Sequence, residues 1–330
     1  MNVEFHYYST AFLAVKAGFS LPDATTVAYA SQYVDHHHRS YKIMTRRGTV
    51  SSGPTQNYSF WDPSTVNDVL APFHFFPAGL DASGMPRPSV RNDGARSAWE
   101  VRPDAPGAKK LLVDALRSAN LCRIGLALHT YSDTWAHQNF TARNEPWNRL
   151  EAGSRLPSPG HAQAGSAPDL WLTTWTDPRL LDPEVVNLLR FSAAARKVYR
   201  YLCTFKGKDF RADEEEVAEE LKELVEAGRG RDNADERSLE FILNLNLEPY
   251  DRNLWTGQAL EPKEETPWPT VDHLKKVGED LLHQVGLVNP EQVRAKANFD
   301  DSLFAAWVRA ADEHRALAKR LIQEVISPKS

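Results

Sequence analysis

Three potential metal ligands stand four residues apart in the segment 129–137, which reads HTYSDTWAH and contains His129, Asp133 and His137. On an α-helix, steps of four and eight residues rotate by only about 40° and 80°, so the three side chains share one face. Eight residues also span about 12 Å, which is too far for both histidines to bind one ion at about 2 Å. The spacing therefore predicts two ions, one bound by His129 and Asp133 and one by His137, with the Asp133 carboxylate able to bridge them.

A structural role is the alternative for such residues, because a His–Asp pair on a buried helix can simply hydrogen-bond to each other and to nearby backbone. Three of them at regular spacing on an otherwise apolar helix favour a metal site. Burying these groups without compensation would be costly.

Further candidate ligands lie in irregular segments or on helices beside them. They are His6 in the sequence FHYY, Asp35 at the end of SQYVD, His74 between two phenylalanines, and His161 and Asp169 in the segment 160–169. An isolated histidine is more often a core or surface residue, but a metal-binding helix nearby makes each a better candidate. At most one of His36, His37 and His38 is expected to reach the site, and His273, His283 and His314 are expected to be structural.

The elements that position these residues are predicted to be helices. Apolar residues recur at helical spacing in 9–18, 22–38, 108–140, 183–204, 213–226, 234–246, 271–285 and 299–325. The 108–140 helix is apolar on more than one side, so it is expected at the centre of the fold. Since no strand pattern stands out, the sequence predicts an all-α fold: a single large helical domain (1–330) around a buried multi-metal site. Residues 1–170 would form the metal-site half and residues 171–330 the supporting helices.

Two long segments, 39–106 and 141–169, are rich in Gly, Pro, Ser and Asn and are expected to be irregular loops. Long loops on a rigid scaffold commonly carry function. Both contain proposed ligands, so they are expected to line one cleft over the ions, with Trp61, Phe76 and Trp135 among its walls.

Composition limits the class of protein. The 330 residues are 42% hydrophobic, which suffices for a large core, and a net charge of −5 with dispersed Lys and Arg indicates no general surface for duplex nucleic acid. Two cysteines in apolar stretches suit a reducing compartment and exclude a Cys-based zinc site. Neither a secretory leader nor an apolar run of about 18 residues is found, so the expected location is the cytoplasm, without stable membrane insertion.

The order of these candidate ligands resembles the zinc-dependent phospholipase C and S1/P1 nuclease superfamily over about residues 1–170. The sequence FHYY and the block LHTYSDTWAHQ (128–138) also resemble an uncharacterised bacterial family associated with that superfamily. The resemblance implies an all-helical protein with up to three zinc ions. The first would be surrounded by Asp35, His74, His129 and Asp133, the second by His137, His161 and Asp169, and His6 with Asp133 would contribute to a third.

This chain departs from the superfamily pattern in three places. It starts with Met1, where the superfamily uses the amine and side chain of a mature N-terminal Trp. His137 follows Asp133 by four residues, a shorter spacing than in the secreted enzymes, and Asp169 follows His161 by eight residues instead of four. These departures bear on the third ion and on Asp169.

Such a site predicts hydrolysis of a phosphodiester or phosphomonoester by metal-activated water, with Asp35 and Asp133 as candidate catalytic residues. The expected cofactor is zinc, two or three ions, although another divalent metal would also fit. The substrate could be a lipid, a nucleotide or a nucleic acid, and nothing in the sequence indicates an oligomeric state.

Three other classes compete with this interpretation. A di-iron or di-manganese protein would favour Glu and Glu-x-x-His pairs. A non-catalytic metal-binding protein, or a toxin or defence-type effector, would have a structural site closed by four protein ligands. An HD-type phosphohydrolase would carry adjacent His-Asp, whereas this chain has Asp35 before His36.

Overall fold

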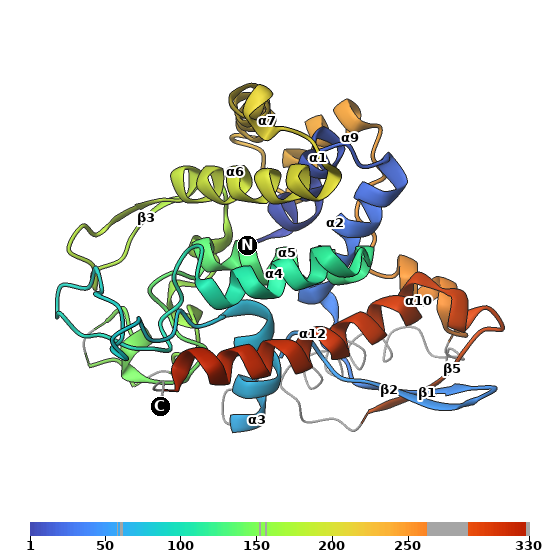
Figure 1. Cartoon of the computed structure of the whole chain (residues 1–330), viewed down its shortest axis with the longest axis horizontal. Helices are drawn as coiled ribbons and strands as arrows, with labels where there is room; N and C mark the ends of the chain where they lie inside the picture. Colours follow the sequence, from blue (N-terminus) through green and yellow to red (C-terminus); the bar gives the residue numbers. More distant parts are fainter. Residues whose placement is uncertain (58, 60–61, 152, 156, 263–289, 328–330) are drawn as a thin grey trace.

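Helices form most of the chain in the computed structural model, which describes residues 1–57, 59, 62–151, 153–155, 157–262 and 290–327 (Figure 1). The first half contains η1 (Glu4–Ser9), α1 (Thr10–Lys16), α2 (Leu21–His36), α3 (Pro63–Thr65), η2 (Val66–His74), α4 (Pro106–Ser118), α5 (Leu121–Ala136), η3 (Pro146–Asn148), η4 (Ala162–Ala164) and η5 (Ala167–Asp169). The second half contains α6 (Asn187–Lys206), η6 (Phe210–Ala212), α7 (Glu214–Ala227), α8 (Ala234–Arg237), α9 (Leu239–Leu245), α10 (Leu254–Ala259), η7 (Phe299–Asp301) and α12 (Leu303–Ile326).

Helix α5 occupies the centre of the fold, as the apolar pattern predicts. Helices α2, α4, α6, α12 and η2 all pack against it, and Figure 1 shows α6 and α12 on opposite sides. Gly125 allows α2 to approach closely, because a Cβ at this position would lie only 2.3 Å from the Val27 carbonyl oxygen. One hydrophobic cluster includes residues from Met1 to Ile322, so both halves of the chain contribute to the core around α5.

Two of the elements, η1 and η2, are π-helices, a conformation that well under 1% of residues adopt. Each carries a predicted ligand: His6 lies in η1, and His74 is the last residue of η2. Both histidines are buried. Because π-helical turns are frequent at functional sites, their occurrence at both of these positions draws attention to the two histidines.

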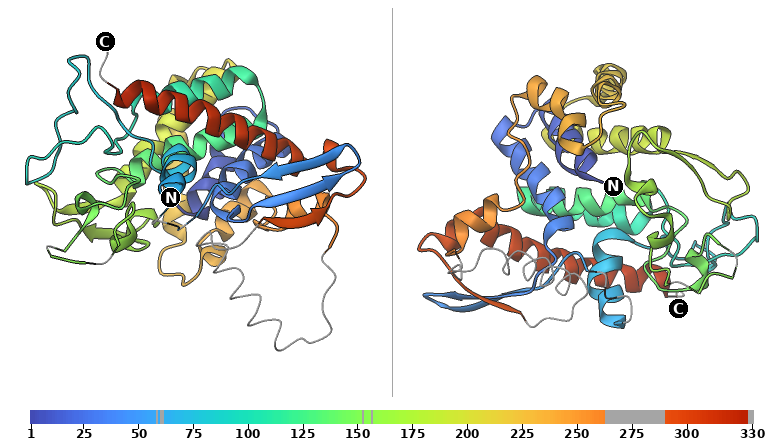
Figure 2. Two further views of the ribbon diagram at one scale, coloured as in Figure 1. Left: turned by 90° about the horizontal axis from the view of Figure 1, so that it is seen from below. Right: turned by 180° about the vertical axis from the view of Figure 1, so that it is seen from behind.

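The prediction of an all-α fold is wrong, because the described residues include five strands in two small sheets. Strand β1 (Tyr41–Thr45) pairs antiparallel with β2 (Gly48–Ser52) and parallel with β5 (Glu291–Arg294), and β3 (Thr174–Thr176) pairs antiparallel with β4 (Glu184–Val186). The two sheets lie at opposite ends of the molecule (Figures 1 and 2). The chain is therefore mostly helical with a minor β component.

The single helix predicted over 108–140 is in fact two helices. Ala119 adopts a left-handed conformation with φ of 51°, and the Asn120 side chain then caps α5 by accepting a hydrogen bond from the Arg123 N–H. Helix α5 ends before His137, whose N–H still bonds to the Asp133 carbonyl. The segment 234–246 likewise divides into α8 and α9.

Other predicted segments have mixed outcomes. The segment 141–169 is largely irregular, with short 3₁₀ turns, whereas 39–106 also contains a hairpin and η2. The helix predicted at 271–285, with its two histidines, and Trp61 lie outside the described residues. None of the helices described here is both long and apolar enough to cross a bilayer.

Candidate metal centre

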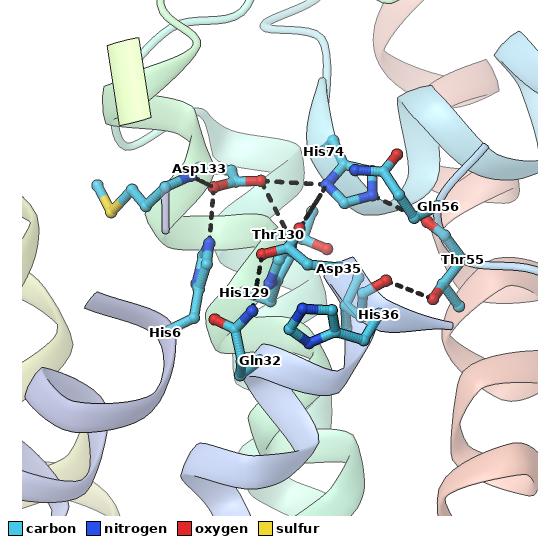
Figure 3. Close-up of polar contacts among 12 residues, drawn as sticks. His6, Gln32, Asp35, His36, Thr55, Gln56, His74, His129, Thr130 and Asp133 are labelled. Carbon is cyan, nitrogen blue, oxygen red and sulfur yellow. Dashed lines mark hydrogen bonds and ion pairs between the residues drawn. The ribbon is translucent and has the colours of Figure 1, made fainter. Parts of the chain in front are cut away.

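The eight predicted ligands converge on one place in the fold, part of which is drawn in Figure 3. Six of them line a cavity of about 140 Å³ together with Met1: Asp35, His74, Asp133, His137, His161 and Asp169. The other two, His6 and His129, are fully buried beside it and contact Asp133. The ligands therefore come from η1, α2, η2, α5 and the loop after α5.

Asp133 lies at the centre of the cluster and is 1% exposed. Its Oδ1 accepts a hydrogen bond from the Met1 amine at 2.5 Å and lies 3.1 Å from His6 Nε2. Its Oδ2 lies 3.3 Å from His129 Nε2 and 3.4 Å from His74 Nδ1. The two oxygens thus face different sets of nitrogens, as a carboxylate that bridges two ions must do.

Asp35, His74 and His129 form a first group, called here the helix group. Asp35 Oδ1 lies 3.8 Å from His74 Nδ1 and 3.6 Å from His129 Nε2, and these two nitrogens are 3.2 Å apart. His74 donates its other ring N–H to the Thr55 carbonyl at 2.8 Å. In a neutral ring this leaves the lone pair on Nδ1, directed at the other ligands.

His137, His161 and Asp169 form a second group, called here the loop group. The two oxygens of Asp169 lie 3.1 Å from His137 Nε2 and 3.3 Å from His161 Nε2. The Nδ1–H of each histidine donates to a backbone carbonyl, that of His137 to His74 at 2.7 Å and that of His161 to Gly165 at 3.0 Å. Metal-binding histidines typically have such an outer partner, which fixes the tautomer.

The Met1 amine, His6 and Asp133 Oδ1 form a third set, called here the N-terminal group. The His6 ring stacks on His129 with centroids 3.8 Å apart. His129 lies near both the helix group and His6. Only its Nε2 faces the cluster, and the single lone pair of that nitrogen can bind only one ion. We therefore assign His129 to the helix group.

Protonation states at His6, His129 and Asp133 suit cation binding, whereas at His74 burial is outweighed by the hydrogen bond to Asp133 and the nearby carboxylates, which raise the pKa. Burial lowers the pKa of His6 and of His129 to about 4, so both rings are neutral at pH 7. Burial opposes ionisation of Asp133, but His137 and the Met1 ammonium outweigh it and hold the pKa of this carboxyl well below its usual range. Neutral imidazoles beside ionised carboxylates are the forms that bind metal.

The cavity carries an excess of negative charge. Asp35, Asp133 and Asp169 all line it, and neither Lys nor Arg is among its described lining residues. The carboxylates raise the pKa of the Met1 amine to about 11 despite its burial, so this ammonium offsets one charge. Carboxylates that exceed their cationic partners fit a site for divalent cations, because a buried charge such as that of Asp133 is costly without a partner.

The match to a protein family described as "Family of unknown function (DUF6765)" covers residues 1–322, nearly the whole chain. The chain belongs to this family. Neither the curated proteins nor the solved structures contain a match to it. The likeness to the phospholipase C and S1/P1 nuclease superfamily therefore stays a prediction.

The cleft of this DUF6765 protein is lined by both of the segments predicted to form it. Gln56, Asn57 and Phe75 come from the first segment, and Pro159 and Ala162 from the second. The expected walls are wrong in part, since neither Phe76 nor Trp135 lines the cavity. Both are buried in the core instead, whereas Phe75 faces the ligands and stacks on His137.

Sequence reasoning missed two features of the DUF6765 site. No role was assigned to the Met1 amine from the sequence, and the signal that could have placed it in the site is the short distance along the chain to His6. Phe75 stacks on His137 with ring centroids 4.5 Å apart, and its position directly after His74 could have indicated this.

The remaining described histidines lie outside the ligand groups. None of the run 36–38 belongs to a group, and His37 is buried with its Nε2 2.8 Å from Ser52 Oγ. His314 is buried behind α5, where its Nε2 lies 3.0 Å from Thr130 Oγ1. It therefore packs against α5 and η2 and is not among the residues that line the cavity.

Proposed function

We propose that this chain is a zinc-dependent phosphoesterase that hydrolyses a phosphodiester or phosphomonoester with a metal-activated water. The observation that carries the proposal is the meeting of the helix, loop and N-terminal groups at one cavity, with Asp133 in contact with members of all three. Adjacent ions at one cavity are the arrangement of two-metal hydrolases.

Imidazole and carboxylate donors suit zinc, so the helix and loop groups would each hold one ion. The N-terminal group would hold a third only with the Met1 ammonium deprotonated, because a protonated amine has no lone pair for a metal. Bound ions would lower the pKa of a water and offset negative charge on the phosphate. The chain supplies the positions of these ligands, which backbone carbonyls fix at His74, His137 and His161.

Asp35 and Asp133 would have different tasks. Both oxygens of Asp133 already face nitrogens of the cluster, so its task is to hold the groups together. Asp35 is 21% exposed and lines the cavity, and among the described residues its Oδ2 accepts one long hydrogen bond, of 3.4 Å from Gln32. This oxygen would accept a hydrogen bond from the attacking water.

The cavity walls define what part of the substrate enters. Leu70, Phe75 and Pro159 are apolar and exclude water, whereas Gln56 and Asn57 bring amide groups. A volume of about 140 Å³ is close to that of an engineered cavity that accepts benzene. The phosphoryl group and its nearest substituent would fit, and the rest of the substrate would lie outside.

The accessibility of the ligands favours this proposal over a structural metal site. The Asp35, His161 and Asp169 side chains are 21%, 18% and 21% exposed. A structural zinc site is closed by four protein ligands, whereas a catalytic one keeps a position for water. A cavity that reaches ligands of both the helix and loop groups is consistent with the second kind.

The proposal is tested with zinc-reconstituted protein and four substrates: a nitrophenyl phosphomonoester, a bis-nitrophenyl phosphodiester, a short-chain phospholipid and single-stranded DNA. Hydrolysis of at least one should depend on zinc and be lost in Asp35→Asn. Asp209→Asn is the matched control, because Asp209 is 66% exposed and pairs with Arg211. A fully zinc-loaded protein that hydrolyses none of the four would contradict the proposal.

A further inference from the structure

The turn that directs Met1 and His6 toward Asp133 is fastened to the C-terminal half of the chain by an ion pair. Arg237, the last residue of α8, donates from Nε to Glu4 Oε1 at 2.5 Å. The Glu4 side chain is only 8% exposed, and the two residues are 233 positions apart.

Glu4 also makes hydrogen bonds within the turn, and these link Arg237 to Met1 and His6. Its Oε1 also accepts from the Asn2 side-chain amide at 3.2 Å, and its own N–H donates to Asn2 Oδ1 at 3.2 Å. The Asn2 carbonyl then accepts from the N–H groups of Phe5 and His6 at 3.1 and 3.0 Å. Because Asn2 follows Met1 directly, these contacts orient both the Met1 amine and His6.

Arg237 is itself held firmly in place. Its Nη1 donates to the carbonyls of Arg231 and Asp232 at 3.3 and 3.2 Å. The backbone of Arg237 packs against Gly228, where a Cβ would lie 2.7 Å from the Arg237 carbonyl oxygen. Arg237 is therefore held at the end of α8 by its own backbone and side-chain contacts and does not extend freely from the surface.

The ion pair between Glu4 and Arg237 matters because the Glu4 carboxylate is buried. A carboxylate as buried as Glu4 needs a partner, because an unpaired buried charge is costly. In the part of the chain that the structure describes, Arg237 is the cation that Glu4 contacts. Without Arg237, the Glu4 carboxylate would have to move toward solvent to be hydrated. The turn that starts at Asn2 would then no longer be held in place.

We infer that Arg237 is a positioning residue of the metal centre, which holds the Met1 amine and His6 against Asp133 through Glu4 and Asn2. The inference rests on the proposed function, because it concerns the ion that the N-terminal group would hold. It gives the C-terminal half of the chain a specific part in the site, beyond packing around α5.

The test is zinc titration of the full chain against a competing chelator, for wild type and Arg237→Gln. One ion should bind about 10–100-fold more weakly in the variant, as is typical for loss of an outer partner, and the other ions should bind as before. Arg237→Lys, which keeps the charge, should recover part of the affinity. Arg211→Gln is the matched control, because Arg211 is 76% exposed and distant in sequence from the ligands.

Hydrogen exchange of the metal-free protein supplies a second measurement that does not depend on zinc. Arg237→Gln should speed exchange in residues 2–9 and leave residues 121–137 unchanged. Unchanged zinc affinities with unchanged exchange would overturn the inference, as would an equal loss of every ion with faster exchange throughout. A wild-type chain that binds no zinc would overturn the proposed function instead, and exchange alone would then decide whether Arg237 holds the turn.

Discussion

Replacing Gly125 with alanine tests whether the close crossing of α2 and α5 sets the geometry of the metal centre. The new Cβ would lie 2.3 Å from the Val27 carbonyl oxygen and 2.6 Å from Ala30 Cβ, whereas ordinary contact begins at 3.4 Å. Helix α2 must therefore retreat by about 1 Å at this crossing, since a packed core has little room to absorb the change.

This shift would reach the ligands, because α2 carries Asp35 two turns beyond Val27 and α5 carries His129 one turn beyond Gly125. The distance of 3.6 Å between Asp35 Oδ1 and His129 Nε2 would lengthen. Overpacking lowers the free energy of unfolding by about 1–3 kcal/mol. The higher helix propensity of alanine offsets about 1 kcal/mol of this loss. A misplacement of about 1 Å can lower a catalytic rate about 100-fold.

The assay combines urea unfolding with zinc affinity and the rate of ester hydrolysis. Gly125→Ala should lower the free energy of unfolding by about 0–2 kcal/mol and lower zinc affinity and rate far more. Gly257→Ala in α10 is the control: a Cβ there would meet nothing within 4 Å, so both functional quantities should stay at wild-type values. Wild-type zinc affinity and rate in Gly125→Ala would refute the reasoning.

Three further predictions follow from the site and its surroundings. Asp133→Asn keeps the side-chain shape but loses the charge, so it should lose at least one zinc ion and all hydrolysis while its circular dichroism stays that of wild type. Gly160→Ala would place a Cβ 2.3 Å from the Phe75 ring and should lower kcat by about tenfold or more, whereas Gly153→Ala, also at positive φ but in open surroundings, should not change kcat. Burial lowers the pKa of His37 from an ordinary value of 6.5 to about 3. Between these two pH values the imidazole is therefore protonated in the unfolded chain but neutral in the folded chain. Its contribution to stability is complete above pH 6.5 and falls with pH, by about 2 kcal/mol at pH 5, and urea unfolding of His37→Asn should show that much less loss between pH 8 and pH 5.

Each of these predictions has a clear contrary result. Full zinc content and activity in Asp133→Asn would show that this carboxylate is structural. Equal kcat values for the two glycine variants would show that the position of the Phe75 ring does not affect the reaction. Parallel pH dependences for wild type and His37→Asn would mean that folded His37 accepts a proton readily.

The part of the site that lies on one helix was predictable from sequence, because helical periodicity alone places His129 and Asp133 on one face. Asp35, His74 and His161 were candidates by residue type, but only the resemblance grouped them around particular ions, since their approach to α5 depends on long-range packing. The spacing of Asp169 made it the weakest candidate. The structure nevertheless places it between His137 and His161, because the loop that carries it turns back toward α5.

The errors in the predicted fold have two physical causes. Ala119 favours a helix by propensity, so the break there was hidden, and the only local sign was a good capping residue at Asn120. Strand β1 gains its parallel partner from β5, about 250 positions further along the chain, and a local pattern cannot show such a pairing. Short strands with few buried residues also lack a clear alternation.

The most direct test of the metal centre is elemental analysis of the native chain and of the chain reconstituted with zinc and then desalted. The three ligand groups predict at least two zinc ions for each chain, and a third where the N-terminal group is filled. They also predict that Asp133→Asn retains fewer ions than wild type. No more than a trace of transition metal in either wild-type preparation would contradict the account.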